Sequence, residues 1–264
     1  MERVADASVE ADVSRLAPGR DAGPGPGWPA GLAALVPVFD HVATVGGVVA
    51  GLRAMGAPVL VIDDGSSDGS GAAATAAGGV VVRQAPNAGK GAALARGLRL
   101  LADQGFVQAL TVDADGQHPL PEAGRLARAA AAEPAALHVG SRDMQRAPRA
   151  SRFGRRWSDL WVRIACGAWP GDAQSGLRCY PLPITTTLAI GARRYSWEVE
   201  VLVRAAWAGV ALRPLPVAVL YPADRVSHFR AVADNARTAW TFTRLVTRRC
   251  LAACGLARLT PRGR

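Results

Sequence analysis

Two aspartates, Asp113 and Asp115, stand one residue apart directly after an apolar run at residues 106–112. The run predicts a buried strand, and the glycine and proline that follow it predict the turn that ends it. Both carboxylates should therefore lie at the carboxyl end of a strand, where open α/β sheets bind their ligands. Together with the amide oxygen of Gln117 they form a set of hard oxygen ligands that suits Mg²⁺ or Mn²⁺. In the alternative interpretation this is an ordinary solvated turn, with Asp115 as a helix cap.

A second acidic pair, Asp63 and Asp64, ends another apolar run at residues 58–62. Because the carboxyl ends of parallel strands meet at one edge of a sheet, we expect this pair to lie beside Asp113 and Asp115. A carboxylate there can accept hydrogen bonds from ribose hydroxyls or from a base N–H group. Asp64 can equally cap the helix that follows, and the two roles are compatible.

Lys90, the only lysine of the chain, stands between two glycines at the start of a predicted helix. Free N–H groups and the helix dipole favour anions at such a position. The segment is not a Walker A motif, and no Gly-x-Gly-x-x-Gly follows the first predicted strand, so the ATPase and nicotinamide-enzyme interpretations lose their main support. A capping role for this segment alone is the alternative.

Apolar runs alternate with segments of helical pattern about ten residues long. This order predicts an α/β fold, with a mostly parallel sheet that is covered by helices and connected by right-handed crossovers. The expected strands are residues 32–39, 58–62, 80–83, 106–112, 136–140 and 210–220, and the expected helices are residues 44–55, 66–77, 87–102, 121–132, 157–167 and 197–207.

The chain divides into three predicted parts. Residues 1–30 are rich in glycine, proline and charge without periodicity, which predicts a disordered leader. Residues 31–224 hold the alternating elements. Residues 225–264 contain nine arginines against one acid, interleaved with aromatic and aliphatic residues, and predict a basic C-terminal helix. Such a helix can lie on an anionic membrane surface, or it can pack on the domain with a solvated arginine face.

The composition limits the classes of protein to which the chain can belong. With 264 residues, 50% of them hydrophobic, the chain can form one large α/β domain. The net charge of +10 predicts an anionic partner: nucleic acid, lipid headgroups or phosphorylated substrates. The four cysteines lack zinc-binding spacing, which favours a reducing compartment. The chain shows neither the basic patch and apolar run of a signal peptide nor a stretch apolar enough for a membrane span. We expect a cytoplasmic protein.

Six motifs occur in an order that resembles the glycosyltransferases of family 2, and within that family the synthases of dolichyl-phosphate and polyprenyl-phosphate sugars. The motifs lie at residues 37–40, 61–69, 87–91, 113–118, 140–142 and 172–178. The resemblance implies a GT-A fold, which is Rossmann-like, together with a nucleotide-sugar donor, a divalent metal and inversion at the anomeric carbon. The chain departs from this branch at residues 39–41 and 221–230, which leaves another lipid-linked acceptor open.

The motif positions imply roles for the acidic residues. Asp63 and Asp64 are implied to bind the nucleoside, and Asp113 and Asp115 to hold the metal. Gln117 is implied as a further contact to the metal or to a phosphate.

Three arginines fall where this branch binds the phosphates of donor and acceptor: Arg142, Arg152 and Arg225. A planar guanidinium group suits bidentate phosphate binding, although each of the three can also be a solvated surface residue. The remaining motif residues assigned to the substrates are Pro37, Lys90, Gln174 and Arg178.

The implied reaction is an in-line displacement, in which an acceptor oxygen attacks the anomeric carbon and a nucleoside diphosphate leaves. The metal held by Asp115 and Asp113 neutralises charge on the diphosphate. A phosphate acceptor such as polyprenyl phosphate is already ionised, whereas a hydroxyl of another lipid or glycan needs a general base. Asp172 is the first candidate for that base, and Glu198 and Glu200 follow.

We therefore expect a glycosyltransferase at the inner face of the membrane, held there by its basic C-terminal helix, with no nucleic-acid partner. Three rivals remain. A nucleotide-sugar pyrophosphorylase needs a glycine-rich loop with arginine and lysine after the first strand, which is absent here. A nucleic-acid-binding protein needs a recognisable reading module. A degenerate transferase that serves as a scaffold is disfavoured by the intact pair of Asp113 and Asp115.

Overall fold

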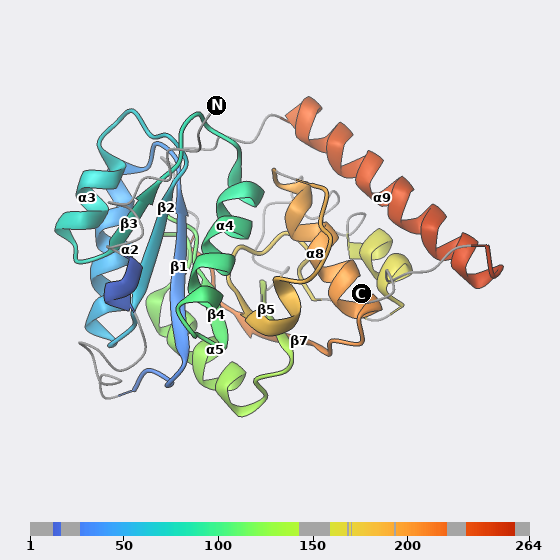
Figure 1. The fold of residues 1–264 in the computed structure, drawn as a ribbon, viewed down its shortest axis with the longest axis horizontal. Helices are drawn as coiled ribbons and strands as arrows, with labels where there is room; N and C mark the ends of the chain where they lie inside the picture. Colours follow the sequence, from blue (N-terminus) through green and yellow to red (C-terminus); the bar gives the residue numbers. More distant parts are fainter. Residues whose placement is uncertain are drawn as a thin grey trace.

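Seven strands form one sheet in the computed structural model, and helices cover both of its faces (Figure 1). The structure describes residues 13–16, 27–142, 159–167, 169, 171–192, 194–220 and 231–256, with residues 231–236 described by their backbone only. The strands are β1 (Leu32–Val38), β2 (Val59–Asp63), β3 (Val80–Arg83), β4 (Gln108–Thr111), β5 (Leu137–Arg142), β6 (Arg178–Pro181) and β7 (Leu212–Val217).

The helices alternate with the first five strands as predicted, and three labelled helices follow later in the chain. They are η1 (Ser14–Leu16), α2 (Val42–Ala54), α3 (Ser70–Ala76), α4 (Lys90–Asp103), α5 (Leu120–Ala132), α7 (Leu182–Thr185), α8 (Ser196–Trp207) and α9 (Ala231–Ala253), and residues 159–166 are also helical.

The strand order is β3-β2-β1-β4-β6-β5-β7. β1 runs parallel to both of its neighbours, with Val38 opposite Asp63 of β2 and Leu35 opposite Thr111 of β4. β5 and β7 are also parallel, whereas β6 runs antiparallel to β4 and to β5. The prediction of a mostly parallel α/β sheet is confirmed. Strand β6 was not predicted, because its residues were interpreted only as part of a binding motif.

Side chains of β1 alternate between two apolar cores, as the period of a strand requires. Ala33 and Leu35 pack in the core under α4 and α8, whereas Ala34 and Val36 pack in the core under α2, α3 and α5. Figure 1 shows α2 and α3 on one side of the sheet and α4 on the other. Because both faces are covered, the ligand-binding surface is confined to the edge where the strands end.

Part of the predicted leader is packed against the domain, which corrects that prediction for the residues concerned. Leu16, at the end of the 3-10 helix η1, and Val13, just before that helix, are buried in the core that holds Leu60 and Ile62. Trp28 is buried as well, and its Nε1 donates to the carbonyl of Leu32 at 2.9 Å. The local composition does not reveal that these scattered apolar residues are buried in the core.

The C-terminal helix α9 packs lengthwise against α8 (Figure 1). Phe242 and Leu245 of α9 are buried in the core, while Trp240 is 70% exposed. Helix α9 thus covers residues 231–253 of the segment predicted as a basic C-terminal helix, and Leu251 on it is 40% exposed. In the part of the chain that the structure describes, no helix combines the length and the apolar character that a membrane crossing needs.

Candidate active site

A cavity of about 820 Å³ opens at the carboxyl ends of β1, β2, β4 and β5. Eight of the residues predicted to bind substrate or metal line it: Pro37, Asp64, Lys90, Asp113, Asp115, Gln117, Arg142 and Gln174. The sheet thus gathers residues from motifs that are far apart in the sequence. This is the arrangement expected for ligand binding at the strand ends of an α/β sheet.

Lys90, at the start of α4, contacts two acids of this cavity. Its Nζ lies 2.7 Å from Oδ1 of Asp113 and 3.1 Å from Oε1 of Glu198, a residue in the first turn of α8. Burial alone would lower the pKa of Lys90, but the charges of Asp113 and Glu198 outweigh it and raise the pKa above its ordinary value. Lys90 therefore carries a positive charge between two carboxyl groups.

Asp113 and Asp115 differ in their electrostatic surroundings. Burial opposes ionisation of Asp113, yet Lys90 and then His118 hold its pKa below the ordinary value. Burial and the nearby charge of Asp113 raise the pKa of Asp115. Two carboxylates that repel each other at the edge of a cavity are a donor set that fits a divalent cation. The structure's described residues contain no cluster of three or more His, Cys, Asp or Glu side chains with metal-site geometry.

Gln117 holds Asp115 in place. Its backbone N–H donates to Oδ1 of Asp115 at 3.0 Å, and its side-chain Nε2 donates to Oδ2 at 2.6 Å. The amide group that was predicted to contact the metal or a phosphate thus orients the neighbouring carboxylate, although Gln117 also lines the cavity.

Gly176 lets the backbone before β6 approach Asp113. A Cβ atom at this position would lie 2.0 Å from Oδ2 of Asp113, closer than any real contact. The hydroxyl of Thr111 donates to the carbonyl of Gly176 at 2.8 Å and fixes the approach. The segment that leads into the antiparallel strand β6 therefore forms the wall behind Asp113.

Asp64 lines the cavity and also organises the loop before α4. Its carboxylate accepts hydrogen bonds from the backbone N–H groups of Ala88 at 2.8 Å and Gly89 at 2.7 Å. Gln84 Nε2 donates to it at 2.6 Å. The position of Lys90 thus depends on Asp64.

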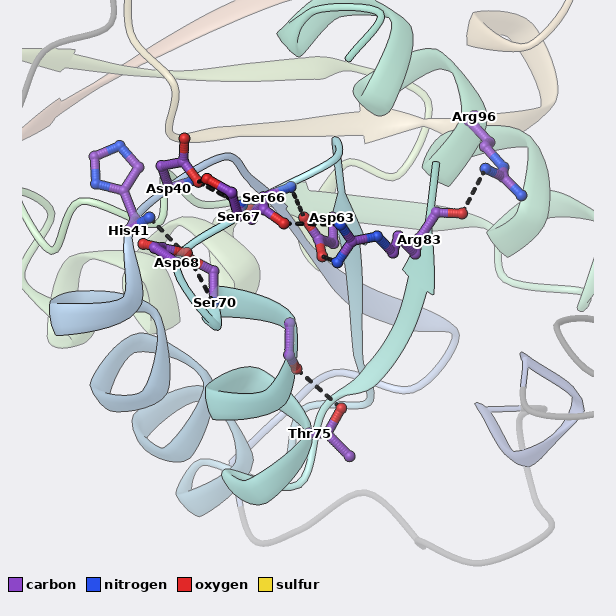
Figure 2. Close-up of polar contacts among 11 residues, drawn as sticks. Asp40, His41, Asp63, Ser66, Ser67, Asp68, Ser70, Thr75, Arg83 and Arg96 are labelled. Carbon is purple, nitrogen blue, oxygen red and sulfur yellow. Dashed lines mark hydrogen bonds and ion pairs between the residues drawn. The ribbon is translucent and has the colours of Figure 1, made fainter. Parts of the chain in front are cut away.

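Asp63 points away from the cavity, into the loops beneath it. Figure 2 shows its carboxylate accepting from the N–H of Ser66 at 2.8 Å and from Nη1 of Arg83 at 3.2 Å. Asp63 is buried and does not line the cavity. The structure gives it a bracing role, which differs from the predicted contact with the nucleoside.

The loop after β1 is tied to the loop after β2 (Figure 2). Asp40, whose φ of 51° lies in the left-handed region, accepts from the N–H of Ser67 at 2.8 Å. Asp68 accepts from the N–H groups of Val42 at 2.8 Å and Ser70 at 2.9 Å. Helix α3 begins at Ser70, after Gly69 with its φ of 93°, and not at residue 66 as predicted. The two loops next to the cavity therefore form one unit.

Arg142 lines the cavity at the end of β5, with Asp172 behind it. Nη2 of Arg142 donates to Oδ1 of Asp172 at 2.8 Å, and Nε of Arg142 contacts Oδ2. Asp172 is buried and is not a cavity-lining residue. A carboxylate with both oxygens on a guanidinium group is poorly placed to take a proton, so the geometry does not support the predicted base and indicates a positioning residue.

Arg178 is fully buried and also differs from its predicted contact with substrate. Its guanidinium donates to the carbonyls of Glu198 at 2.6 Å and Ala173 at 2.7 Å. It therefore joins β6 to α8, the helix that presents Glu198. The two other predicted arginines, Arg152 and Arg225, lie outside the described residues.

Several lining residues were not predicted. Arg194 and Tyr195 come from the segment just before α8, and Thr238 comes from α9. No local motif marks these residues, because they reach the cavity only through the packing of α8 and α9.

Comparison with protein families gives one match over more than half of the chain. The sequence model of glycosyl transferase family 2 matches residues 34–175. An uncharacterized protein of Methanocaldococcus jannaschii is 27% identical over 197 residues, which are 71% of this chain and 80% of that protein. The polyprenol monophosphomannose synthase of Mycolicibacterium smegmatis is 27% identical over 173 residues, 60% of this chain and 65% of the synthase.

Solved structures share the fold. Mannosyl-3-phosphoglycerate synthase from Rubrobacter xylanophilus superposes with a TM-score of 0.62 at 19% identity, over 96% of this chain and 87% of that one. Glucosyl-3-phosphoglycerate synthase from Mycobacterium tuberculosis, crystallised with Mn²⁺, UDP-glucose and phosphoglyceric acid, gives 0.60 at 20% identity, over 94% of this chain and 83% of that one. At such identities the likeness confirms the predicted GT-A fold.

Proposed function

The chain belongs to glycosyl transferase family 2, and from this premise we propose that it transfers a sugar from a nucleotide-sugar donor to a phosphate-bearing, lipid-linked acceptor such as polyprenyl phosphate. Membership of the family establishes a glycosyltransferase. The proposal of a phosphate-bearing acceptor rests on the hydrogen bonds and ion pairs of the acids that line the 820 Å³ cavity.

Each acid that lines the cavity already has a partner. Asp64 accepts from backbone N–H groups, and Asp115 accepts from Gln117. Asp113 and Glu198 share the ammonium group of Lys90. In the described part of the chain, no carboxylate that lines the cavity is left without such a partner. This favours an acceptor that is ionised before it binds, as a phosphate is near neutral pH.

Asp113 and Asp115 are the residues that would hold Mg²⁺ or Mn²⁺. Bound there, the ion supplies positive charge next to the leaving diphosphate. The relative from Mycobacterium tuberculosis is described with Mn²⁺ and UDP-glucose, which supports the same assignment for this chain.

The chain's own residues bind and orient the substrates. Arg142 presents a guanidinium group, held in place by Asp172, to a phosphate in the cavity. Lys90 offers an ammonium group at the start of α4, where the helix dipole also favours anions.

We further propose peripheral attachment to the inner, cytoplasmic face of the membrane. Trp240 and Leu251 of α9 are exposed beside arginines of the same helix. An exposed aromatic residue with neighbouring positive charge is suited to an anionic lipid surface. The polyprenol monophosphomannose synthase relative supports a lipid acceptor for this chain.

A thermal-shift screen tests the donor site. UDP, GDP and their sugars are added with and without Mn²⁺, and we expect one diphosphate together with the metal to raise the melting temperature. Asp115→Asn should abolish this metal-dependent rise. If none of the nucleotides raises the melting temperature, the proposal is contradicted. Incubation with the identified donor and polyprenyl phosphate, read by mass spectrometry, then tests the acceptor against a glycan or lipid hydroxyl.

A further inference from the structure

Lys90 holds its ammonium group between two carboxylates that come from different elements. Asp113 lies just past the end of β4, and Glu198 lies in the first turn of α8. The Nζ atom of Lys90 is 2.7 Å from Oδ1 of Asp113 and 3.1 Å from Oε1 of Glu198. One oxygen of a carboxylate assigned to the metal is therefore in contact with a cation that belongs to the chain itself.

The carboxylate of Asp113 has little room to move. The backbone of Gly176 lies so close that a Cβ atom there would collide with both carboxylate oxygens. The hydroxyl of Thr111 donates to the carbonyl of Gly176 at 2.8 Å and holds this backbone in place. Asp115 is also fixed, by two hydrogen bonds from Gln117. A divalent cation therefore meets two carboxylates whose positions are already set.

The ammonium group of Lys90 is the movable member of this cluster. Its four-carbon stem is flexible, and its three N–H donors rotate together. Only 19% of the side chain is exposed, so water screens its charge weakly. A divalent cation on Asp113 would share a carboxylate with the ammonium, and two positive charges repel strongly at low dielectric. The ammonium is therefore the group that has to give way.

Glu198 is placed to keep the ammonium when it leaves Asp113. Its side chain is 6% exposed and already in contact with Nζ of Lys90. Its backbone is held on both sides, since its N–H donates to the carbonyl of Tyr195 at 3.3 Å and its carbonyl accepts from Nη1 of Arg178 at 2.6 Å. Burial of a charge is costly unless the charge is paired. A small rotation of the lysine stem thus preserves a charged partner for both groups.

We propose that Lys90 is a built-in counter-ion of Asp113 that a divalent cation displaces, and that Glu198 is the positioning residue that receives its ammonium group. The inference rests on the proposed function in placing the divalent cation at Asp113 and Asp115. It adds a role for Glu198, which was considered as a general base on sequence grounds. Glu198 acts on the metal site through Lys90, without contact to the substrates.

The first test follows Lys90 directly, because it is the only lysine of the chain. Full-length protein labelled with ¹⁵N at lysine Nζ gives one lysine ammonium signal in an NMR spectrum, and Lys90→Arg removes it. We expect titration with Mg²⁺ to shift this signal until the site is saturated. Asp115→Asn should abolish the shift. Glu133→Gln is the matched control, since it removes an exposed carboxylate at the end of α5 and should leave the shift unchanged.

The second test measures the affinity for Mn²⁺ from the paramagnetic resonance signal of the unbound ion. We expect Lys90→Met to bind Mn²⁺ about tenfold more tightly than the wild type, because the ion no longer displaces a charge-assisted contact. Glu198→Gln should weaken binding about tenfold, since the ammonium then stays on Asp113. The same substitution made in Lys90→Met should have no effect, which a double-mutant cycle measures.

An unmoved Lys90 signal at saturating Mg²⁺ overturns the inference, and this arm uses the wild-type fold. Lys90→Met that binds Mn²⁺ no more tightly than the wild type overturns it as well. Equal weakening by Glu198→Gln with and without Lys90 contradicts the positioning role. Binding that Asp115→Asn abolishes while the Lys90 signal stays in place sinks the inference and leaves the proposed function standing. If neither ion binds, with or without UDP, the proposed metal site and the inference fail together.

Discussion

The ammonium group of Lys90 lies 2.7 Å from the carboxylate of Asp113, so the lysine between two glycines and the acidic pair meet in one ion pair. Lys90→Met would leave two acids, Asp113 and Glu198, close together without their shared cation. We expect unfolding free energy to fall by about 3 kcal/mol, as for a buried pair that loses one member. Urea unfolding measures this, and Lys90→Arg serves as the charge-preserving control. An unchanged midpoint in Lys90→Met would contradict the assigned ion pair.

Gly176→Ala should damage the metal site more than the fold. The new methyl group would collide with Oδ2 of Asp113, which must move. We expect the Mn²⁺-dependent thermal shift with nucleoside diphosphate to disappear. The matched control is Gly47→Ala in α2, where a Cβ atom meets nothing within 4 Å and should stabilise the helix by about 0.5–1 kcal/mol. Retention of the metal-dependent shift in Gly176→Ala would show that Asp113 does not hold the ion.

The substitution Asp172→Asn distinguishes two roles of Asp172: orienting Arg142, or acting as the general base. If Asp172 only orients Arg142, steady-state kinetics should show a KM for the donor raised about tenfold with kcat nearly unchanged. If Asp172 is the general base, Asp172→Asn should show the opposite pattern: kcat should fall at least a hundredfold, and KM should be preserved. The second pattern would restore the role that the sequence predicted for Asp172.

Stability should decrease on acidification through the buried His138. Burial is the largest influence and lowers the pKa of His138; Glu133 opposes it and Arg213 adds to it. Because the folded-state pKa lies below the unfolded value of about 6.5, the unfolded chain binds more protons below that pH, and folding weakens as the pH falls. Thermal melts at pH 7.5 and 5.5 should show a smaller loss in His138→Asn. An equal loss in both proteins would refute the contribution of His138.

Substitutions of two residues of α9 should distinguish packing against the protein from contact with a membrane. Leu245 is buried, so Leu245→Ala should reduce unfolding free energy by about 3 kcal/mol. Trp240 is exposed, so Trp240→Ala should leave unfolding unchanged and weaken sedimentation with phosphatidylglycerol vesicles. Wild type that remains entirely in the supernatant at low salt would contradict attachment to a membrane.

The strands that carry the first motifs could be predicted because their signal is local. The run at residues 106–112 is apolar and ends in turn residues, so β4 and its acids were placed correctly. The difference between Asp63 and Asp64 could not be predicted in this way. Neighbouring residues of an extended chain point to opposite sides, and which side faces the cavity depends on the loops around it.

Strand β6 was missed for a related reason. It is four residues long and begins with Arg178, whose polar side chain argues against a buried strand until its partners are known. Those partners are the carbonyls of Ala173 and Glu198, and the second of these comes from a different element. The contributions of Arg194 and Thr238 escaped prediction likewise, since they depend on how α8 and α9 pack.

The cavity is lined both by residues at the strand ends and by Thr238 of α9, the last helix that the structure describes. Under the proposed function, the strand ends bind the nucleotide sugar, and the last helix supplies a separate part of the cavity wall. Evolution can thus exchange the last helix, or an engineer can graft one from a relative, to redirect the enzyme toward new recipients while its donor chemistry stays intact.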